Sequence, residues 1–134
     1  LVVSQTTIKA KTFFDTAEAI KTITDDEVEI VNTICSATRD RQEAARALAG
    51  MVDAFYIIGA THSSNSVKLH AVCKEQCQKS FLIETEDDID PADLFGAQTV
   101  GVTAGASTPE WLIKKVVKHL ESINPNGTKD MALA

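Results

Sequence analysis

Two stretches of the sequence place hydroxyl and amide side chains where an apolar run gives way to a helical pattern. The first, "HSSNS", runs from His62 to Ser66, one residue after the apolar segment 54–60. The second, "GASTP", covers 105–109 and follows the apolar segment 98–104. Hydroxyl groups, an amide and free backbone N–H groups are the donors that bind a phosphate at the start of a helix. Both stretches are therefore candidate anion sites.

The "HSSNS" stretch also has a purely structural interpretation. One serine can cap a helix that starts near Ser66 or Val67, and Asn65 can form an Asx-type turn. Capping alone leaves Ser63 or Ser64 without a role. No lysine or arginine lies within either stretch, so an anion there would be held by neutral donors.

The "GASTP" stretch has the same two interpretations. Ser107 and Glu110 fit a capping box, whereas Pro109 fits the first helical position if Thr108 is the cap. In either case one of the two hydroxyls has no structural role. Gly105 would let the backbone approach a ligand closely. Two such stretches at one sheet edge favour anion binding over capping alone.

The three cysteines differ in their sequence context. Cys35, in "NTICSAT", lies at another strand-to-helix turn, where a thiol gains thiolate character. It can be a nucleophile, one ligand of a metal site or a buried small side chain, and iron–sulfur and zinc sites need three or four ligands. Cys73 and Cys77 share a predicted helix face with Leu69 and Val72, so core packing is favoured for them over a metal pair.

The elements that position these residues alternate along the chain. Apolar runs predict strands at 1–3, 28–32, 54–60, 80–84 and 98–104, and helical patterns lie around 13–23, 39–51, 66–77 and 112–120, with a short turn near 91–95. This alternation predicts an α/β fold with a parallel sheet, and continuously apolar strands predict helices on both of its faces. The carboxyl ends of parallel strands share one edge, where ligands bind. After Ile123 the pattern is lost, which predicts a loose tail.

Composition limits the function classes. The 134 residues suffice for one domain, and 44% hydrophobic with 24% charged residues is typical of a soluble globular protein. The net charge of −6 and the lack of a basic stripe argue against nucleic-acid binding. No apolar stretch could span a membrane and no signal pattern is present, so we expect a cytoplasmic protein without a membrane partner. Three cysteines without a signal indicate a reducing compartment.

Five segments of the chain have a familiar order. They are "VSQTT", "NTICSATRDRQEAARALA", "IIGATHSSNSVKL", "FLIET" and "VGVTAGASTPEWLI", and together they reach to about Ile123. In this order they resemble the 4-hydroxy-3-methylbut-2-enyl diphosphate reductases, the LytB family, which catalyse the last step of the non-mevalonate isoprenoid pathway. Any one segment alone would be a weak signal, whereas the combination is specific.

The resemblance implies three similar α/β domains around a cavity that holds a [4Fe-4S] cluster, with one cysteine ligand from each domain. It also implies reductive removal of the substrate's hydroxyl, giving isopentenyl and dimethylallyl diphosphates, with electrons from a donor such as ferredoxin or flavodoxin. The implied roles are cluster binding for Cys35, a catalytic position for Thr6, diphosphate binding for Ser63, Ser64, Asn65 and Ser107, and cavity positions for Thr38 and Gln42.

The sequence departs from this family by lacking the motifs of the other two cluster cysteines, the histidines and the proton-relay glutamate. The chain also starts without a methionine. We therefore expect the C-terminal part of such an enzyme: 1–30 as the end of the middle domain, 31–123 as the third domain and 124–134 as the tail. Its partners would be the remaining N-terminal domains, and alone it would have neither cluster nor reductase activity.

Two other interpretations remain open at this point. One is a non-catalytic diphosphate-binding module derived from the third domain. The other, less favoured, is a homotrimer in which three copies of Cys35 assemble one cluster.

Overall fold

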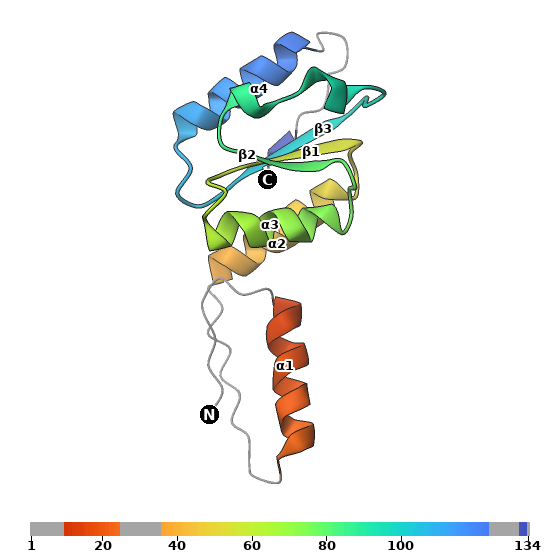
Figure 1. Ribbon diagram of the computed structural model, residues 1–134, viewed down its shortest axis with the longest axis vertical. Helices are drawn as coiled ribbons and strands as arrows, with labels where there is room; N and C mark the ends of the chain where they lie inside the picture. The colour runs from red at the N-terminus through yellow and green to blue at the C-terminus, as the bar shows by residue number, and fades with distance from the viewer. Residues whose placement is uncertain (1–9, 25–35, 124–131, 134) are drawn as a thin grey trace.

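The structure, a computed structural model, describes residues 10–24, 36–123 and 132–133 (Figure 1). The strands are β1 (Ala54–Ile58), β2 (Ser80–Ile83), β3 (Val100–Ala104) and β4 (Ala132–Leu133). The helices are α1 (Ala10–Ile23), α2 (Ser36–Ala49), α3 (Ser64–Lys74) and α4 (Glu110–Ile123), and two 3-10 helices span Glu86–Asp88 and Pro91–Leu94. The predicted strands at 1–3 and 28–32, and the site residues Thr6 and Cys35, lie outside the described residues.

The four described strands form one sheet in the order β2-β1-β3-β4, and every neighbouring pair is parallel. In the centre, Ile57 is paired with Leu82 on one side and with Thr103 on the other. Parallel strands need crossover connections. Helix α3 connects β1 to its neighbour β2, and the segment 84–99 connects β2 to β3, which lies on the other side of β1. The predicted α/β fold with a parallel sheet is confirmed.

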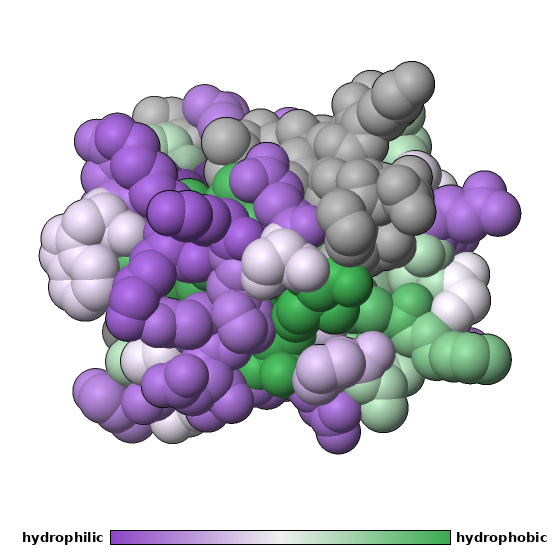
Figure 2. Space-filling model, turned by 90° about the horizontal axis from the view of Figure 1, so that it is seen from above, coloured by the Kyte–Doolittle hydropathy of each residue, from purple (hydrophilic) through white to green (hydrophobic). Residues whose placement is uncertain are grey.

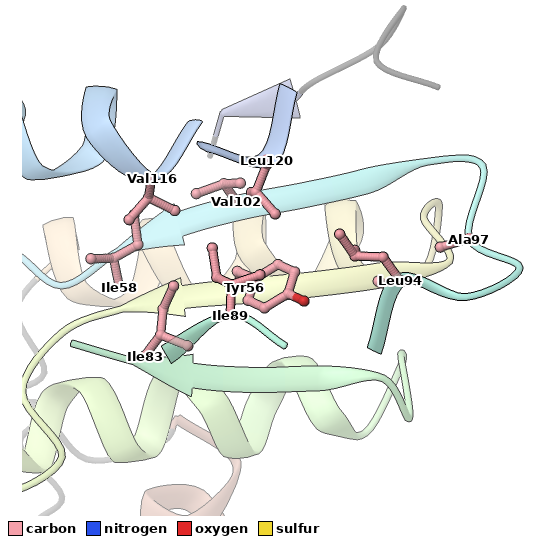
Figure 3. Packing of buried hydrophobic residues seen from close by; sticks show 10 residues of the cluster. Tyr56, Ile58, Ile83, Ile89, Leu94, Ala97, Val102, Val116 and Leu120 are labelled. Carbon is pink, nitrogen blue, oxygen red and sulfur yellow. The ribbon is translucent and has the colours of Figure 1, made fainter. Parts of the chain in front are cut away.

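Strand β1 is buried along its whole length, and its side chains alternate between two cores. Tyr56 and Ile58 pack with Val102 and with Val116 and Leu120 of α4 on one face (Figure 3). Phe55 and Ile57 pack on the other face with side chains of α2 and α3, namely Ala45, Ala49, Leu69 and Cys73. Figure 1 shows the same layers, with α4 on one side of the sheet and α2 and α3 on the other. Helices on both faces, as predicted, explain the continuously apolar strand.

Helix α4 is amphipathic because Val116 and Leu120, four residues apart, turn toward the sheet. Figure 2 looks down on this end of the molecule and shows hydrophilic residues on one side of the surface and a hydrophobic patch on the other. Trp111, in the first turn of α4, is 65% exposed. The helix therefore covers the core with one stripe and leaves its first turn open to solvent.

Helix α1 lies beyond α2, away from the sheet (Figure 1). Its residues Phe13 and Ala17 are buried, and they are four apart and so share one face. The helix predicted around 13–23 is confirmed, and it begins three residues earlier than expected.

Of the predicted tail 124–134, the structure describes only Ala132 and Leu133, which form β4 beside β3. Two residues carry too little pattern to predict a strand from sequence. They pair with the edge of β3, which offers backbone groups that β1 does not use.

Candidate anion-binding site at the carboxyl edge of the sheet

The two hydroxyl-rich stretches meet because β1 and β3 are parallel neighbours. Both strands end at the same edge of the sheet, so the loops 59–63 and 105–109 leave it side by side. Helices α3 and α4 begin directly after these loops, and Figure 1 shows both helices starting at that end of the molecule. Helix α2 also starts at this end, since it runs back toward the start of β1. The sheet thus gathers three helix N-termini at one edge.

Ser63 is the N-cap of α3. Its backbone is extended (φ −76°, ψ 115°), its side chain accepts a hydrogen bond from the Ser66 amide at 3.4 Å, and its carbonyl accepts one from the Val67 amide at 3.0 Å. The helix therefore begins at Ser64, and the predicted start near Ser66 or Val67 is wrong. Each of several nearby serines satisfies the local rule for an N-cap. In the structure Ser63 is the cap, and Ser66 is buried at 2% exposure.

The first turn of α3 presents donors that no described residue uses. The amides of Ser66 and Val67 are bonded to Ser63, whereas those of Ser64 and Asn65 have no acceptor within the described segments. Ser64 is exposed and Asn65 is half-buried. Two backbone N–H groups, together with a hydroxyl and an amide, thus remain at the positive end of the helix dipole.

The loop after β3 is folded over the end of β1 by Thr108. The Thr108 hydroxyl donates to the Ile58 carbonyl at 2.9 Å, and the Gly105 amide donates to the same oxygen at 2.9 Å. Ser107 is exposed, and its hydroxyl has no hydrogen-bond partner in the described part of the chain. Of the two hydroxyls considered from the sequence, Ser107 is therefore the one without a structural role.

The loop after β1 is held from the other side by Glu84, which follows β2. The backbone amide and the hydroxyl of Thr61 both donate to Glu84 Oε1, at 2.7 Å and 2.8 Å. These hydrogen bonds, the backbone one first, lower the pKa of Glu84. The loop is thus fixed to the neighbouring strand on the β2 side, and the carboxylate is occupied by donors.

Thr38 and Gln42 lie one turn apart on α2, as their spacing predicts. Thr38 is half-buried, and Gln42 is buried with its Nε2 lacking a partner among the described residues. Gln42 lines a cavity of about 440 Å³, together with residues of α1, α2 and α3 (Lys11, Thr12, Asp15, Arg39, Glu43, Arg46, Val72 and Glu75). The four predicted diphosphate residues, Ser63, Ser64, Asn65 and Ser107, do not line this cavity. The structure therefore does not bring Gln42 together with them.

Cys73 and Cys77 are core residues, as favoured from the sequence. Both are buried, and Cys77 Sγ donates to the carbonyls of Val52 and Asp53 at 3.7 Å and 3.6 Å. Burial raises the pKa of Cys73 to about 12, so its thiol stays protonated. The described residues contain no group of three side chains able to hold a metal ion. An iron–sulfur cluster therefore does not fit these residues by themselves, and Cys35 lies outside them.

Sequence reasoning missed the roles of Ser66 and Gly59. Ser66 is buried against Gly59 and Gly105, the residues that follow β1 and β3. The signal that could have revealed it is the glycine directly after each of these two strands, with a small polar residue in the next helical turn.

No described helix is long and apolar enough to cross a membrane. The LytB protein family model matches residues 1–121. The chain is 49% identical over 120 residues to the 4-hydroxy-3-methylbut-2-enyl diphosphate reductase of Wolinella succinogenes, which covers 90% of this chain and 43% of that protein. It is 44% identical over 124 residues to the reductase of the same name from Clostridioides difficile, covering 91% of this chain and 43% of that protein.

Solved structures agree with these relatives. The E-1-hydroxy-2-methyl-but-2-enyl-4-diphosphate reductase of Plasmodium falciparum superposes with a TM-score of 0.78 at 27% identity, over 98% of this chain and 41% of that one. A second reductase structure, described as the terminal enzyme of the non-mevalonate pathway, gives a TM-score of 0.65 at 37% identity, over 88% and 42%. This chain thus spans less than half the length of the relatives it matches. Together, the family match, the relatives and the shared fold confirm the resemblance: the chain belongs to the LytB protein family.

Proposed function

We propose that this chain is the C-terminal portion of a 4-hydroxy-3-methylbut-2-enyl diphosphate reductase, in which it binds the diphosphate of the substrate and supplies one thiolate to a [4Fe-4S] cluster. The observation that carries the proposal is the meeting of two loops with unused donors at the ends of β1 and β3. The family membership and the reductase names of the relatives support the reaction.

The diphosphate would be held by neutral donors at two helix starts. Ser64 and Asn65 offer side chains and backbone N–H groups, and Ser107 offers a free hydroxyl from the facing loop. Ser63 can cap α3 and bind phosphate together, because a hydroxyl oxygen that accepts from the Ser66 amide still has its own proton to donate. The positive ends of the α3 and α4 dipoles favour the anionic group at this edge.

The cluster would need the rest of the protein. Cys35 immediately precedes Ser36, the first residue of α2, which is a position that favours a thiolate. One thiolate is fewer than the three or four ligands that a cluster needs, so the remaining cysteines must come from the other domains. When bound, the cluster would supply the electrons for removal of the substrate's hydroxyl.

The finer assignments belong to the same proposal. Residues 1–30 would complete the middle domain, 31–123 would form the third of three similar domains, and Thr6 would lie near the substrate's hydroxyl. Thr38 and Gln42 would be cavity positions of the complete reductase. In this chain Gln42 lines a cavity apart from the serine loops, and its Nε2 has no partner among the described residues. Ferredoxin or flavodoxin would donate electrons, and the enzyme would be cytoplasmic.

The alternative function is a non-catalytic diphosphate-binding module. It is favoured by the lack of a metal-binding group among the described residues. The gene separates the two functions, because the reductase requires an in-phase upstream reading frame with two further cysteine motifs.

The test of the diphosphate site is Ser107→Ala in the complete reductase. Loss of a hydrogen bond to a charged group costs about 1.5–3 kcal/mol, so we expect the KM for the substrate to rise about tenfold or more with a smaller change in kcat. Ser122→Ala is the matched control, because Ser122 is an exposed serine on α4, the helix that follows the Ser107 loop, and its hydroxyl donates to the His119 carbonyl at 2.6 Å. An unchanged KM for Ser107→Ala would contradict the assignment.

A further inference from the structure

We propose that Ser66 is a positioning residue that sets the spacing between the two diphosphate loops. Its buried side chain fills the space that Gly59 and Gly105 leave open at the ends of β1 and β3. The inference rests on the proposed function, because the loops it spaces are the proposed diphosphate site. It assigns a role to a residue that is not among the proposed diphosphate or cluster ligands.

The packing around Ser66 leaves no room for another atom. A Cβ added at Gly59 would overlap Ser66 Oγ and would lie 2.9 Å from Ser66 Cβ. A Cβ added at Gly105 would lie 2.9 Å from Ser66 Oγ. Packed interiors do not tolerate such approaches without displacement. The one side chain of Ser66 therefore touches the backbone of both strand ends.

Close approach, and not backbone conformation, is what requires glycine at these two positions. Among the described residues the only glycine with positive φ is Gly96, in the loop before β3. Gly59 and Gly105 therefore do not have the positive φ that would strain an alanine. What excludes a methyl group at either position is the side chain of Ser66.

The backbone of Gly59 and Gly105, which Ser66 packs against, is held in place by hydrogen bonds. The Gly59 amide donates to the Ile83 carbonyl and the Gly105 amide donates to the Ile58 carbonyl, each at 2.9 Å, so both glycines continue the hydrogen bonding of the sheet. Ser66 is also bonded through its amide to Ser63, the cap of α3. A displacement of Ser66 would therefore move the first turn of α3, with Ser64 and Asn65, relative to the loop that carries Ser107.

The experiment is a double-mutant cycle in the complete reductase, made of Gly59→Ala, Ser66→Gly and the two combined. We expect Gly59→Ala to raise the KM for the substrate and the inhibition constant of inorganic pyrophosphate at least tenfold, with kcat changed less than threefold. Ser66→Gly alone should raise both constants by a smaller factor. The combination should recover most of the affinity lost in Gly59→Ala, because the new methyl group takes the space of the removed side chain.

Gly50→Ala is the matched control, since a Cβ there would meet no atom closer than 3.6 Å. It should leave both constants unchanged. If Gly59→Ala fails to fold, Gly105→Ala replaces it, with Ser66→Ala as the rescuing change, because Ser66 Oγ is the atom that obstructs this methyl group. Thermal unfolding of each variant separates loss of affinity from loss of fold.

The outcomes distinguish the inference from the function on which it rests. If Ser107→Ala raises the KM while the glycine variants fold and bind pyrophosphate like the wild type, the positioning role of Ser66 is wrong and the diphosphate site stands. Additive effects in the cycle, without rescue, would also overturn it. If the complete protein binds neither substrate nor pyrophosphate, both proposals fail.

Discussion

Tyr56 buries a phenol in the core between β1 and α4. Its ring is fully buried and stacks on Phe81 with centroids 5.4 Å apart. Its hydroxyl has no hydrogen-bond partner in the described structure, and Figure 3 shows the oxygen pointing toward Leu94 and Ala97. Burial, assisted by the charges of nearby aspartates, raises the pKa of Tyr56 to about 12. The ring supplies the packing, and the hydroxyl supplies no contact that phenylalanine would lose.

We expect Tyr56→Phe to leave the free energy of unfolding at pH 7 unchanged or to raise it by about 1 kcal/mol, since an unpaired buried hydroxyl is removed. The wild type should lose stability as the pH rises from 10 toward 12, because the unfolded phenol ionises first while the folded one keeps its proton. Urea unfolding across this range should show a smaller loss in the variant. Tyr56 is the only tyrosine of the chain, so phenolate absorbance reports it directly. A large destabilisation at pH 7 would reveal a hydrogen bond of this hydroxyl.

The residues of the proposed anion site differ in burial and hydrogen bonding although their types are similar. Three successive serine and asparagine side chains from "HSSNS" have different environments: Ser63 caps, Ser64 is exposed and Asn65 is half-buried. Ser66, of the same type as two of them, is buried against two glycines. Residue type alone therefore does not separate a phosphate donor from a packing residue.

At the scale of the elements, Asp53 joins the starts of β1 and β3. Its Oδ2 accepts hydrogen bonds from the amides of Gln98 and Thr99 and from the Thr99 hydroxyl, each at 2.9 Å. The Thr99 carbonyl in turn accepts from the amides of Asp53 and Ala54. These bonds, the Thr99 amide first and then that of Gln98, lower the pKa of Asp53. These hydrogen bonds between Asp53 and the residues Gln98 and Thr99, here called the Asp53 clamp, hold the starts of β1 and β3 in register. The other ends of the same strands lead into the loops 59–63 and 105–109 of the proposed anion site.

We expect Asp53→Asn to lower the Tm at pH 7, because three donors lose a charged acceptor. Because the pKa of Asp53 is lower in the folded protein than its ordinary value of 3.8, the carboxylate stabilises the fold above pH 3.8. This stabilisation is lost as the pH falls through the pKa of the folded state. The wild type should therefore lose more stability between pH 5 and pH 2 than the variant, which thermal unfolding across this range will measure. Glu121→Gln, an exposed acid at the end of α4, is the control. Parallel pH profiles for the wild type and Asp53→Asn would contradict the clamp.

At the scale of the whole molecule, the chain is less than half of the relatives it matches. Its described part forms a sheet with two cores and an edge of unused donors, but no group able to hold a metal ion. The proposed diphosphate donors named above therefore lie on this chain, whereas only one of the proposed cluster ligands does.

Iron and sulfide content after anaerobic reconstitution tests this division. We expect the chain alone to bind no stoichiometric cluster and to show no reductase activity, and we expect the complete protein to do both. Cys35→Ser in the complete protein should abolish cluster retention and activity. Cys73→Ala should retain both, because Cys73 is a buried thiol of the core. A stoichiometric cluster on the chain alone would contradict the proposal, and its native mass would then show whether copies share their thiols.

The fold was largely predictable from sequence because the three main strands are continuous apolar runs, each followed by a helical pattern. Strand β4 was not predictable, since two residues carry no period and their order depends on the free edge of β3. The start of α3 was predicted too late, because each of several adjacent serines satisfies the local rule for a cap.

By itself the sequence determined the parallel α/β fold, and it predicted the sheet edge and the two loops of the proposed anion site. Hydrophobic period and turn chemistry are local properties, so they can be read along the chain. Only the tertiary structure decided which hydroxyls are free, since the partners of Thr108 and Ser66 lie on other strands. The Thr108 hydroxyl donates to the carbonyl of Ile58, and Ser66 packs against the glycines that follow β1 and β3, because these strands pair as neighbours despite their separation in sequence. Pairing of distant segments is a property of the folded chain, and no local pattern encodes it.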